Sequence, residues 1–207
     1  MNIEQGLTIF DFRSFNNTIK LTHQLIKTQA IIGNDIIDWQ RAKHQHQKLR
    51  NRCLEKLFQL HEIEYIRSAE NPLLAFWYLW SVKESAYKAW QRQTMSKPVF
   101  NAHTFSCHNI KANSVYVVKD NFYCEVETVF TSQYIYSQCQ SKTRTFKILK
   151  SNQDYLRLKN KWFNEGWQIQ KTAQGVPYLF NKQKSKYLAI SLSHDNRLTA
   201  VNYQLNS

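Results

Sequence analysis

Residues 71–90, NPLLAFWYLWSVKESAYKAW, decide the fold of this 207-residue chain. Asn71 followed by Pro72 is a helix start signal, because an Asn side chain accepts from free backbone N–H groups and proline at the first helical position gives up no hydrogen bond. The aromatic and aliphatic residues that follow cover nearly the whole circumference of a helix. The spacing therefore predicts a largely buried helix that runs to about Trp90.

Strand patterns flank this helix on both sides. Upstream, residues 30–37 are typical of a buried strand, and residues 40–68 have helical spacing with a bend near His61. Downstream, period-two alternation predicts strands at 114–119, 122–130, 133–137, 167–170, 178–180, 187–193 and 198–203. A short helix is expected at 154–165, ending at Gly166, after a polar connection over 141–147. Both parts show a helix followed by antiparallel strands, which indicates an α+β fold with a duplicated outline.

Composition restricts the function classes without choosing one. The formal net charge of +13 attracts nucleic acid, acidic membranes, acidic proteins or polyphosphate ligands. The densest basic stretch, residues 41–56, is either a solvated helix face or a partner-binding face. Apolar runs stay short of the roughly 18 residues that span a bilayer, and residues 1–15 lack the apolar core of a signal peptide. We expect a cytoplasmic protein without a membrane span.

Three side chains have the chemistry of a cation and phosphate site. Residues 30–33 lead as a strand into Asp35, a common position for a metal-holding carboxylate, and Glu84 and Lys88 stand four residues apart on one helix face. Such a Glu–Lys pair is ordinarily a surface ion pair. On a helix that is apolar almost all round, however, the charges need partners. A magnesium ion on two carboxylates together with substrate phosphates would satisfy them.

Two further motifs are weak alone. In Ser191-Leu192-Ser193-His194, strand alternation places Ser191 and Ser193 on one face and His194 on the other. The segment is also typical of a strand end with a hydrogen-bonded histidine. Gly175-Val176-Pro177 by itself predicts a turn.

In combination, these segments resemble the 4'-phosphopantetheinyl transferases. That family has a G-x-D motif at a strand end and a W-x-x-K-E-[AS]-x-x-K helix roughly fifty residues later; residues 33–35 and 80–88 match, with Asp35 and Glu84 49 positions apart. Residues 58–62 are similar to the family's F-x-x-x-E segment. Residues 175–177 and 191–194 are similar to its G-[KR]-P and S-[IL]-S-H motifs. The resemblance covers residues 31–203.

The resemblance implies a fold and an activity. We expect the phosphopantetheinyl transferase fold, with antiparallel sheets each packed on a long helix and with two halves, residues 1–140 and 141–207, that form one compact intramolecular pseudo-dimer in swapped order. We expect a monomer in which one chain builds one cleft. The implied reaction moves 4'-phosphopantetheine from coenzyme A to a serine of an apo carrier protein and releases 3',5'-ADP.

The resemblance also assigns roles to individual residues. Asp35 and Glu84 would hold Mg²⁺, or alternatively Mn²⁺, and Lys88 would neutralise the phosphoryl oxygens. Glu84 or a metal-bound water would accept the serine proton. The cofactor-binding residues would be Lys83, Gly175, Pro177, Ser193 and His194. Of these, Ser193 and His194 would contact the nucleotide phosphates, and Gly175 and Pro177 would contact the adenine.

Two departures and one docking residue complete the comparison. Val176 replaces the usual basic residue of the G-[KR]-P motif, and Ile37 replaces the second acid found in one branch, so two protein carboxylates are expected on the metal. Arg41, six residues beyond Asp35, matches a position that docks acidic acyl or peptidyl carrier proteins. The alternatives are a basic nucleic-acid-binding protein and a carrier-binding relative without catalysis.

Overall fold

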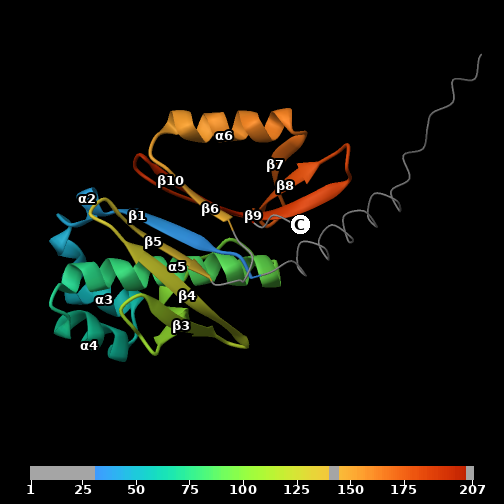
Figure 1. Ribbon diagram of the computed structural model, residues 1–207. Helices are drawn as coiled ribbons and strands as arrows, with labels where there is room; N and C mark the ends of the chain where they lie inside the picture. Colours follow the sequence, from blue (N-terminus) through green and yellow to red (C-terminus); the bar gives the residue numbers. More distant parts are fainter. Residues whose placement is uncertain (1–30, 140–144, 204–207) are drawn as a thin grey trace, which may run out of the picture.

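The structure is a computed structural model that describes residues 31–139 and 145–203 (Figure 1). Two five-stranded antiparallel sheets make up most of it. The first has the order β1 (Asn34–Asp38), β5 (Tyr134–Cys139), β4 (Phe122–Phe130), β3 (Ser114–Lys119) and β2 (Ser106–His108). The second has the order β6 (Thr145–Leu149), β10 (Leu198–Tyr203), β9 (Lys186–Asp195), β8 (Pro177–Asn181) and β7 (Trp167–Lys171).

The two sheets have the same connectivity. In each, the chain makes one strand and then a helix, followed by a four-stranded meander whose last strand pairs with the first. The helices are α5 (Pro72–Thr94) in the first half and α6 (Asn152–Asn164) in the second. The predicted α+β fold with two antiparallel sheets, each packed on a helix, is confirmed. The shared connectivity supports the expected pseudo-dimer.

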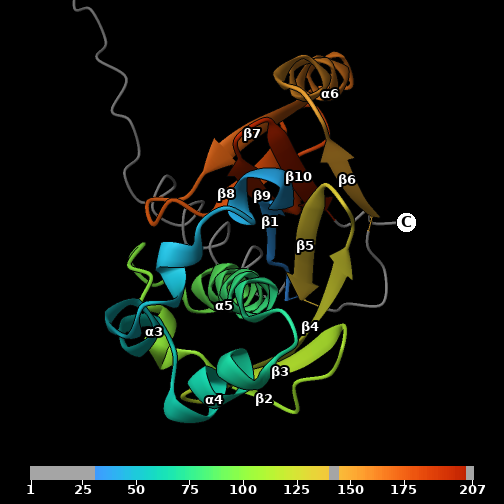
Figure 2. The same ribbon diagram turned by 90° about the vertical axis from the view of Figure 1, so that its left-hand side faces the viewer.

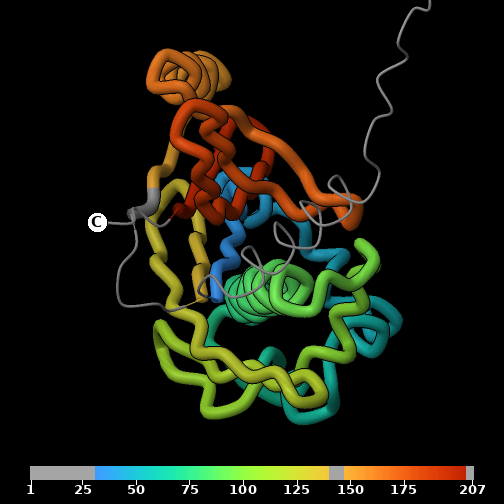
Figure 3. The backbone as a smooth tube through the Cα atoms, turned by 90° about the vertical axis from the view of Figure 1, so that its right-hand side faces the viewer, coloured from blue at the N-terminus to red at the C-terminus, as the bar shows by residue number. Residues whose placement is uncertain are grey.

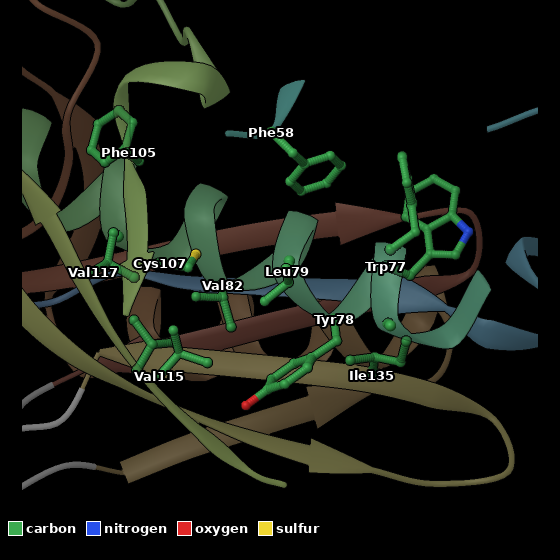
Figure 4. Close-up of a cluster of buried hydrophobic side chains, with 14 of the residues drawn as sticks. Phe58, Trp77, Tyr78, Leu79, Val82, Phe105, Cys107, Val115, Val117 and Ile135 are labelled. Atoms are coloured by element: carbon green, nitrogen blue, oxygen red, sulfur yellow. The ribbon is translucent and has the colours of Figure 1, made fainter. Parts of the chain in front are cut away.

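Helix α5 lies on the first sheet and is enclosed on its other side by short helices (Figure 2). These are α2 (Trp39–Ala42), η1 (His46–Leu49), α3 (Asn51–Leu57) and α4 (Leu60–Ser68), with η2 (Ala102–Thr104) beside them. Leu79 and Val82 of α5 pack against Val115 and Ile135 of the sheet, and Phe58 closes the core from the other side (Figure 4). The buried helix predicted from residues 71–90 is thereby confirmed.

Helix α6 covers the second sheet at the far end of the molecule (Figure 3). Its buried residues are Leu158 and Trp162, which contact a smaller core that includes Leu179 and Ile190. The two halves meet where β1, the edge strand of the first sheet, lies against β9 and β10 of the second. This seam positions the candidate site.

Local signals explain most element boundaries. The Asn71 side chain accepts a hydrogen bond from Leu74 N at 3.0 Å, and α5 ends where Met95 enters the left-handed region at φ 53°. Gly166, with φ 81°, follows α6 as predicted. Within the described ranges, no helix combines the length and apolarity needed to cross a membrane.

Several predicted boundaries differ from the structure, and three of the differences are described here. The helical segment 40–68 is interrupted at residues 43–45, 50 and 58–59 rather than at His61, and α4 starts at Leu60 because Glu62 forms a capping box there. Helix α5 continues past Trp90 to Thr94. Strand β6 begins at Thr145, within the segment predicted to be a connection, because it pairs with β10.

Candidate active site at the seam of the two halves

Gly33 brings β1 onto the backbone of α5. A Cβ atom at this position would lie 2.1 Å from Ser85 O and 2.7 Å from Ala89 N, so any other residue would push the strand away. Lys88 Nζ donates to the carbonyl oxygen of the next residue, Asn34, at 2.9 Å. The close approach places the end of β1 directly beside the helix face that carries the predicted charges.

Asp35, Glu84 and Lys88 form one cluster. Lys88 Nζ lies 3.3 Å from Asp35 Oδ1 and 3.2 Å from Glu84 Oε1. The Asp35 side chain is 4% exposed, whereas those of Lys88 and Glu84 are 21% and 28% exposed. The structure therefore brings together the three residues predicted to be catalytic, with Asp35 innermost and the other two open to a ligand.

Burial controls the charges in this cluster. Desolvation, and then the nearby Glu84 charge, raises the pKa of Asp35 to about 7, although Lys88 and the Ser193 hydroxyl oppose the rise. Burial lowers the pKa of Lys88, but the two carboxylates outweigh it and the net shift is upward. Lys88 therefore stays cationic at neutral pH, while Asp35 needs additional positive charge to ionise fully.

Strand β9 holds Asp35 from the opposite side. Ser191 Oγ accepts from Asn34 N and Ser193 Oγ accepts from Ile36 N, both at 3.1 Å. Ser193 Oγ also donates to Asp35 Oδ1 at 2.7 Å. Because the alternate N–H groups of an edge strand would otherwise be buried without acceptors, these serines satisfy the seam and orient the carboxylate.

A third contact continues the same pattern one step further along both strands. Asp195 Oδ2 accepts from Asp38 N at 2.8 Å. Sequence reasoning assigned no site role to Ser191 or Asp195. The period-two spacing of Ser191, Ser193 and Asp195 was the available signal, since it predicts three polar side chains on one face of the strand.

A cavity of about 440 Å³ adjoins the cluster. Asp35 and Glu84 lie on its wall, together with His194 of β9. Its apolar lining includes Leu57, Phe76, Trp77 and Trp80, and basic side chains from α2, η1 and α3 line it as well, namely Arg41, Lys48 and Lys56. The cavity therefore combines acids for a cation, an apolar surface and positive charge that attracts anionic ligands.

The residues fit a divalent cation that a ligand helps to bind. Asp35 Oδ2 is buried and has no hydrogen-bond partner among the described residues, so one carboxylate oxygen remains available. Glu84 lines the same cavity. Residues 31–139 and 145–203 contain no group of three or more His, Cys, Asp or Glu side chains able to share a metal ion. Two carboxylates with phosphate oxygens and water are the arrangement typical of Mg²⁺.

The prediction that Lys83 binds the cofactor is contradicted by its position. Its side chain is fully buried, and its Nζ contacts Glu62 Oε2 at 2.6 Å, Leu57 O at 3.2 Å and Ala102 O at 3.1 Å. One residue along a helix is a rotation of about 100°, which turns Lys83 into the core while Glu84 faces the cavity. Lys83 and Glu62 join α5 to α4 and η2, and they do not reach a ligand.

The remaining predicted residues lie at two separate places. His194 is exposed on the cavity wall, and its Nδ1 lies 3.0 Å from Thr199 Oγ1. Arg41 also lines the cavity, where its guanidinium pairs with Asp195 and its side chain is 54% exposed. Gly175 and Pro177 are not on the cavity wall; they form the turn between β7 and β8, next to the C-terminal end of α5.

The comparison with protein-family models points to one family. The family model described as "4'-phosphopantetheinyl transferase superfamily" matches residues 31–139. Among solved structures, the holo-[acyl-carrier-protein] synthase of Thermotoga maritima is similar with a TM-score of 0.39 and 8% identity, over 70% of this chain and 80% of that chain. No curated protein matches the chain. The matched residues include β1 and α5 and hence Asp35, Glu84 and Lys88.

Proposed function

Because this chain belongs to the 4'-phosphopantetheinyl transferase superfamily, we propose that it transfers 4'-phosphopantetheine from coenzyme A to a serine hydroxyl of an apo acyl or peptidyl carrier protein. One observation carries the proposal. Asp35 and Glu84 are 49 positions apart in the sequence, yet both line one cavity and both form an ion pair with Lys88. Two acids and a cation at this position suit chemistry on a diphosphate.

In the proposed reaction, the serine oxygen bonds to the phosphorus that carries pantetheine, the bond to the bridging diphosphate oxygen breaks, and 3',5'-ADP leaves with that electron pair. Asp35 and Glu84 would hold Mg²⁺, or alternatively Mn²⁺, which supplies positive charge to the diphosphate. Lys88 offsets negative charge that develops on the phosphoryl oxygens. Glu84, which is partly exposed, is proposed to accept the serine proton.

The second half contributes to binding in this proposal. Ser193 orients Asp35 through its hydrogen bond, and His194 stands on the cavity wall where it can contact the diphosphate. The turn at Gly175 and Pro177 is proposed to lie at the nucleotide end of coenzyme A. Since one chain supplies both sides of the seam, we propose that the enzyme is a monomer. We propose a cytoplasmic location because that is typical of the superfamily.

Arg41 is proposed to dock the carrier protein. It lies at the cavity, its side chain is half exposed, and its partner Asp195 can be exchanged for a carboxylate of an acidic carrier. Opposite charge would also accelerate the encounter. Arg41→Glu should therefore weaken carrier affinity and leave coenzyme A affinity nearly unchanged. An equal fall in coenzyme A affinity would exclude the docking role.

The decisive test is mass spectrometry of apo carrier proteins incubated with the protein, coenzyme A and Mg²⁺. Wild type should add the mass of phosphopantetheine to at least one carrier, whereas Asp35→Ala and Glu84→Ala should add none while staying folded. Glu64→Ala, which removes an exposed acid on α4, is the matched control and should be fully active. Substantial activity in both site variants would refute the site, and an inactive wild type that binds carrier would favour the non-catalytic relative.

A further inference from the structure

Arg92, near the C-terminal end of α5, is a buried cation. Only 2% of the surface of Arg92 is exposed. Its Nη2 atom donates to Pro177 O at 2.7 Å and also to Ile190 O. Its Nε and Nη1 atoms, in contrast, have no hydrogen-bond partner among the described residues. The guanidinium therefore retains unused donors in a site where water is largely excluded.

The charge of Arg92 is not neutralised within residues 31–139 and 145–203, where it forms no ion pair with a carboxylate. Burial alone lowers the pKa of this arginine to about 10, so the side chain remains charged at neutral pH. A buried charge without a counter-charge is costly. Such a group is best stabilised by an anion that accepts from the free N–H groups.

The place of Arg92 indicates which part of the molecule such an anion would contact. Arg92 holds Pro177 O, and its neighbour Gln91 donates to Gln174 O at 2.9 Å, so the two side chains fix the turn between β7 and β8. Val176, in the turn, is buried and apolar at the position where the resembling motif is basic. Arg92 thus brings a cation from α5 to a turn that lacks one.

The turn is open on its outer side. A Cβ atom at Gly175 would meet no described atom within 4 Å, and this glycine has a left-handed φ of 80°. The Gln174 side-chain oxygen is buried and has no partner among the described residues. Arg92, which contacts this turn through Pro177 O, and Gln174, which belongs to it, therefore both have buried polar atoms without described partners.

Arg92 also continues the charged face of α5. Glu84, Lys88 and Arg92 follow one another at four-residue spacing, and each step of that kind advances about 6 Å along a helix. With the diphosphate of coenzyme A at Glu84 and Lys88, the next cation is placed for a second phosphate group of the same ligand. The ribose 3'-phosphate is the remaining one.

We propose that Arg92 binds the 3'-phosphate of coenzyme A and so replaces the basic side chain that Val176 lacks. The proposal rests on the proposed function, because it requires the diphosphate to lie at Asp35, Glu84 and Lys88. Arg92 acts in it as a binding residue for the nucleotide end and takes no part in bond making.

Two ligands that differ by the 3'-phosphate test this role. Affinities of the full chain for coenzyme A and for dephospho-coenzyme A are measured calorimetrically with Mg²⁺ present. Arg92→Met should weaken coenzyme A binding at least tenfold and leave the affinity for dephospho-coenzyme A within twofold of wild type. Arg67→Met, which removes an exposed arginine of α4, controls for the loss of net charge and should change neither affinity.

A purely structural role of Arg92 predicts a different pattern of affinities for the two ligands. If Arg92 merely anchored β8 and β9, Arg92→Met would weaken both ligands equally, and that result would overturn the proposal. If His194→Ala, and not Arg92→Met, removed the preference for coenzyme A, the 3'-phosphate would lie at the cavity and the proposal would also fall. A wild type that binds neither ligand would refute the proposed function itself.

Arg92→Lys keeps the test decisive if Arg92→Met does not fold. It retains the charge but has fewer donors, so thermal unfolding should stay close to wild type. Its preference for coenzyme A over dephospho-coenzyme A should fall, but by a smaller factor than in Arg92→Met, which loses the charge. An unchanged preference would contradict a guanidinium contact to the 3'-phosphate.

Discussion

The two halves share one strand connectivity but bury their helices very differently. In α5, fifteen of 23 residues are buried, whereas in α6 two of 13 are. The first half also contains the fully buried Lys83–Glu62 pair, while the described ion pairs of the second half, on α6, are at least one-third exposed. Duplication of a topology therefore does not duplicate a site. The first half carries the reactive groups, and the second half holds them through side-chain hydrogen bonds from β9, which reach the backbone of β1 and the Asp35 carboxylate.

Gly33→Ala should have the largest effect, because it breaks the contact between β1 and α5. The new Cβ would overlap backbone atoms of Ser85 and Ala89, which cannot move without distorting the helix. We expect transfer activity to be lost and the protein to unfold or lose more than roughly 5 kcal/mol, beyond ordinary overpacking. Gly175→Ala, in the second half, has free space and should cost about 1 kcal/mol for its positive φ. Similar urea midpoints for the two variants would contradict this difference.

Lys83→Met should be next in effect, since it leaves Glu62 buried without its cation. We expect a loss of about 3–5 kcal/mol in the free energy of unfolding. The double variant Lys83→Met with Glu62→Gln should recover much of that loss, because the uncompensated charge is gone. Lys161→Met, which removes a cation from an exposed pair on α6, should change stability by less than about 0.5 kcal/mol. A Lys83→Met protein as stable as Lys161→Met would show that the buried pair is dispensable.

The pH dependence of stability should come from the buried Asp35 at the seam and not from the exposed Asp154 of α6. In the metal-free protein, the pKa of Asp35 is about 7, above its value of 3.8 in an unfolded chain, so the folded state favours the neutral acid. The stabilisation is present below pH 4 and is lost as the pH rises to about 7, by up to roughly 4 kcal/mol. Denaturation in chelator at pH 5 and pH 8 should show roughly 2.7 kcal/mol of this loss, because part of it has already occurred below pH 5.

Asp35→Asn should flatten this pH dependence, because the amide does not titrate. Asp154→Asn on α6 is the matched control and should keep the wild-type dependence. If Asp35→Asn and wild type lost the same stability between pH 5 and pH 8, the burial of Asp35 would not be the cause.

The smallest effect distinguishes two serines of β9. Ser193→Ala and Ser191→Ala each remove one acceptor for a buried N–H group of β1, so both should cost about 1–2 kcal/mol of stability. Ser193 additionally orients Asp35, so its variant alone should lower kcat, by about tenfold for a loss of roughly 1.4 kcal/mol. Equal kcat values for the two variants would mean that β9 supports the strand without orienting the carboxylate.

Much of the fold was predictable from local patterns. Strands β3, β4 and β10 match their predicted ranges, because alternation and tight turns fix both ends. The boundaries that were missed depend on partners distant in sequence. Thr145 becomes part of a strand through pairing with β10, and α4 begins at Leu60 because the buried Glu62 side chain caps it.

The candidate site divides in the same way. The helical spacing of Glu84 and Lys88 places them on one face. Asp35 was expected where a strand ends, but it is the second residue of β1, because this strand begins only at Asn34. Their convergence could not be derived from either segment, because it depends on Gly33 contacting the backbone of α5. Lys83 is buried against Glu62, whereas Glu84 lines the cavity. This difference likewise depends on which neighbours surround each face of the helix.

The sequence by itself determined most of the helices and strands and which side chains have metal- and phosphate-binding chemistry, because these follow from periodicity and residue type. Tertiary structure alone decided that β9 of one half would hold Asp35 of the other, that Lys83 would be enclosed, and that Arg92 would lie beneath a turn without a counter-charge. The physical reason is that burial and hydrogen-bond partners are properties of neighbours in space. Local sequence does not specify those neighbours.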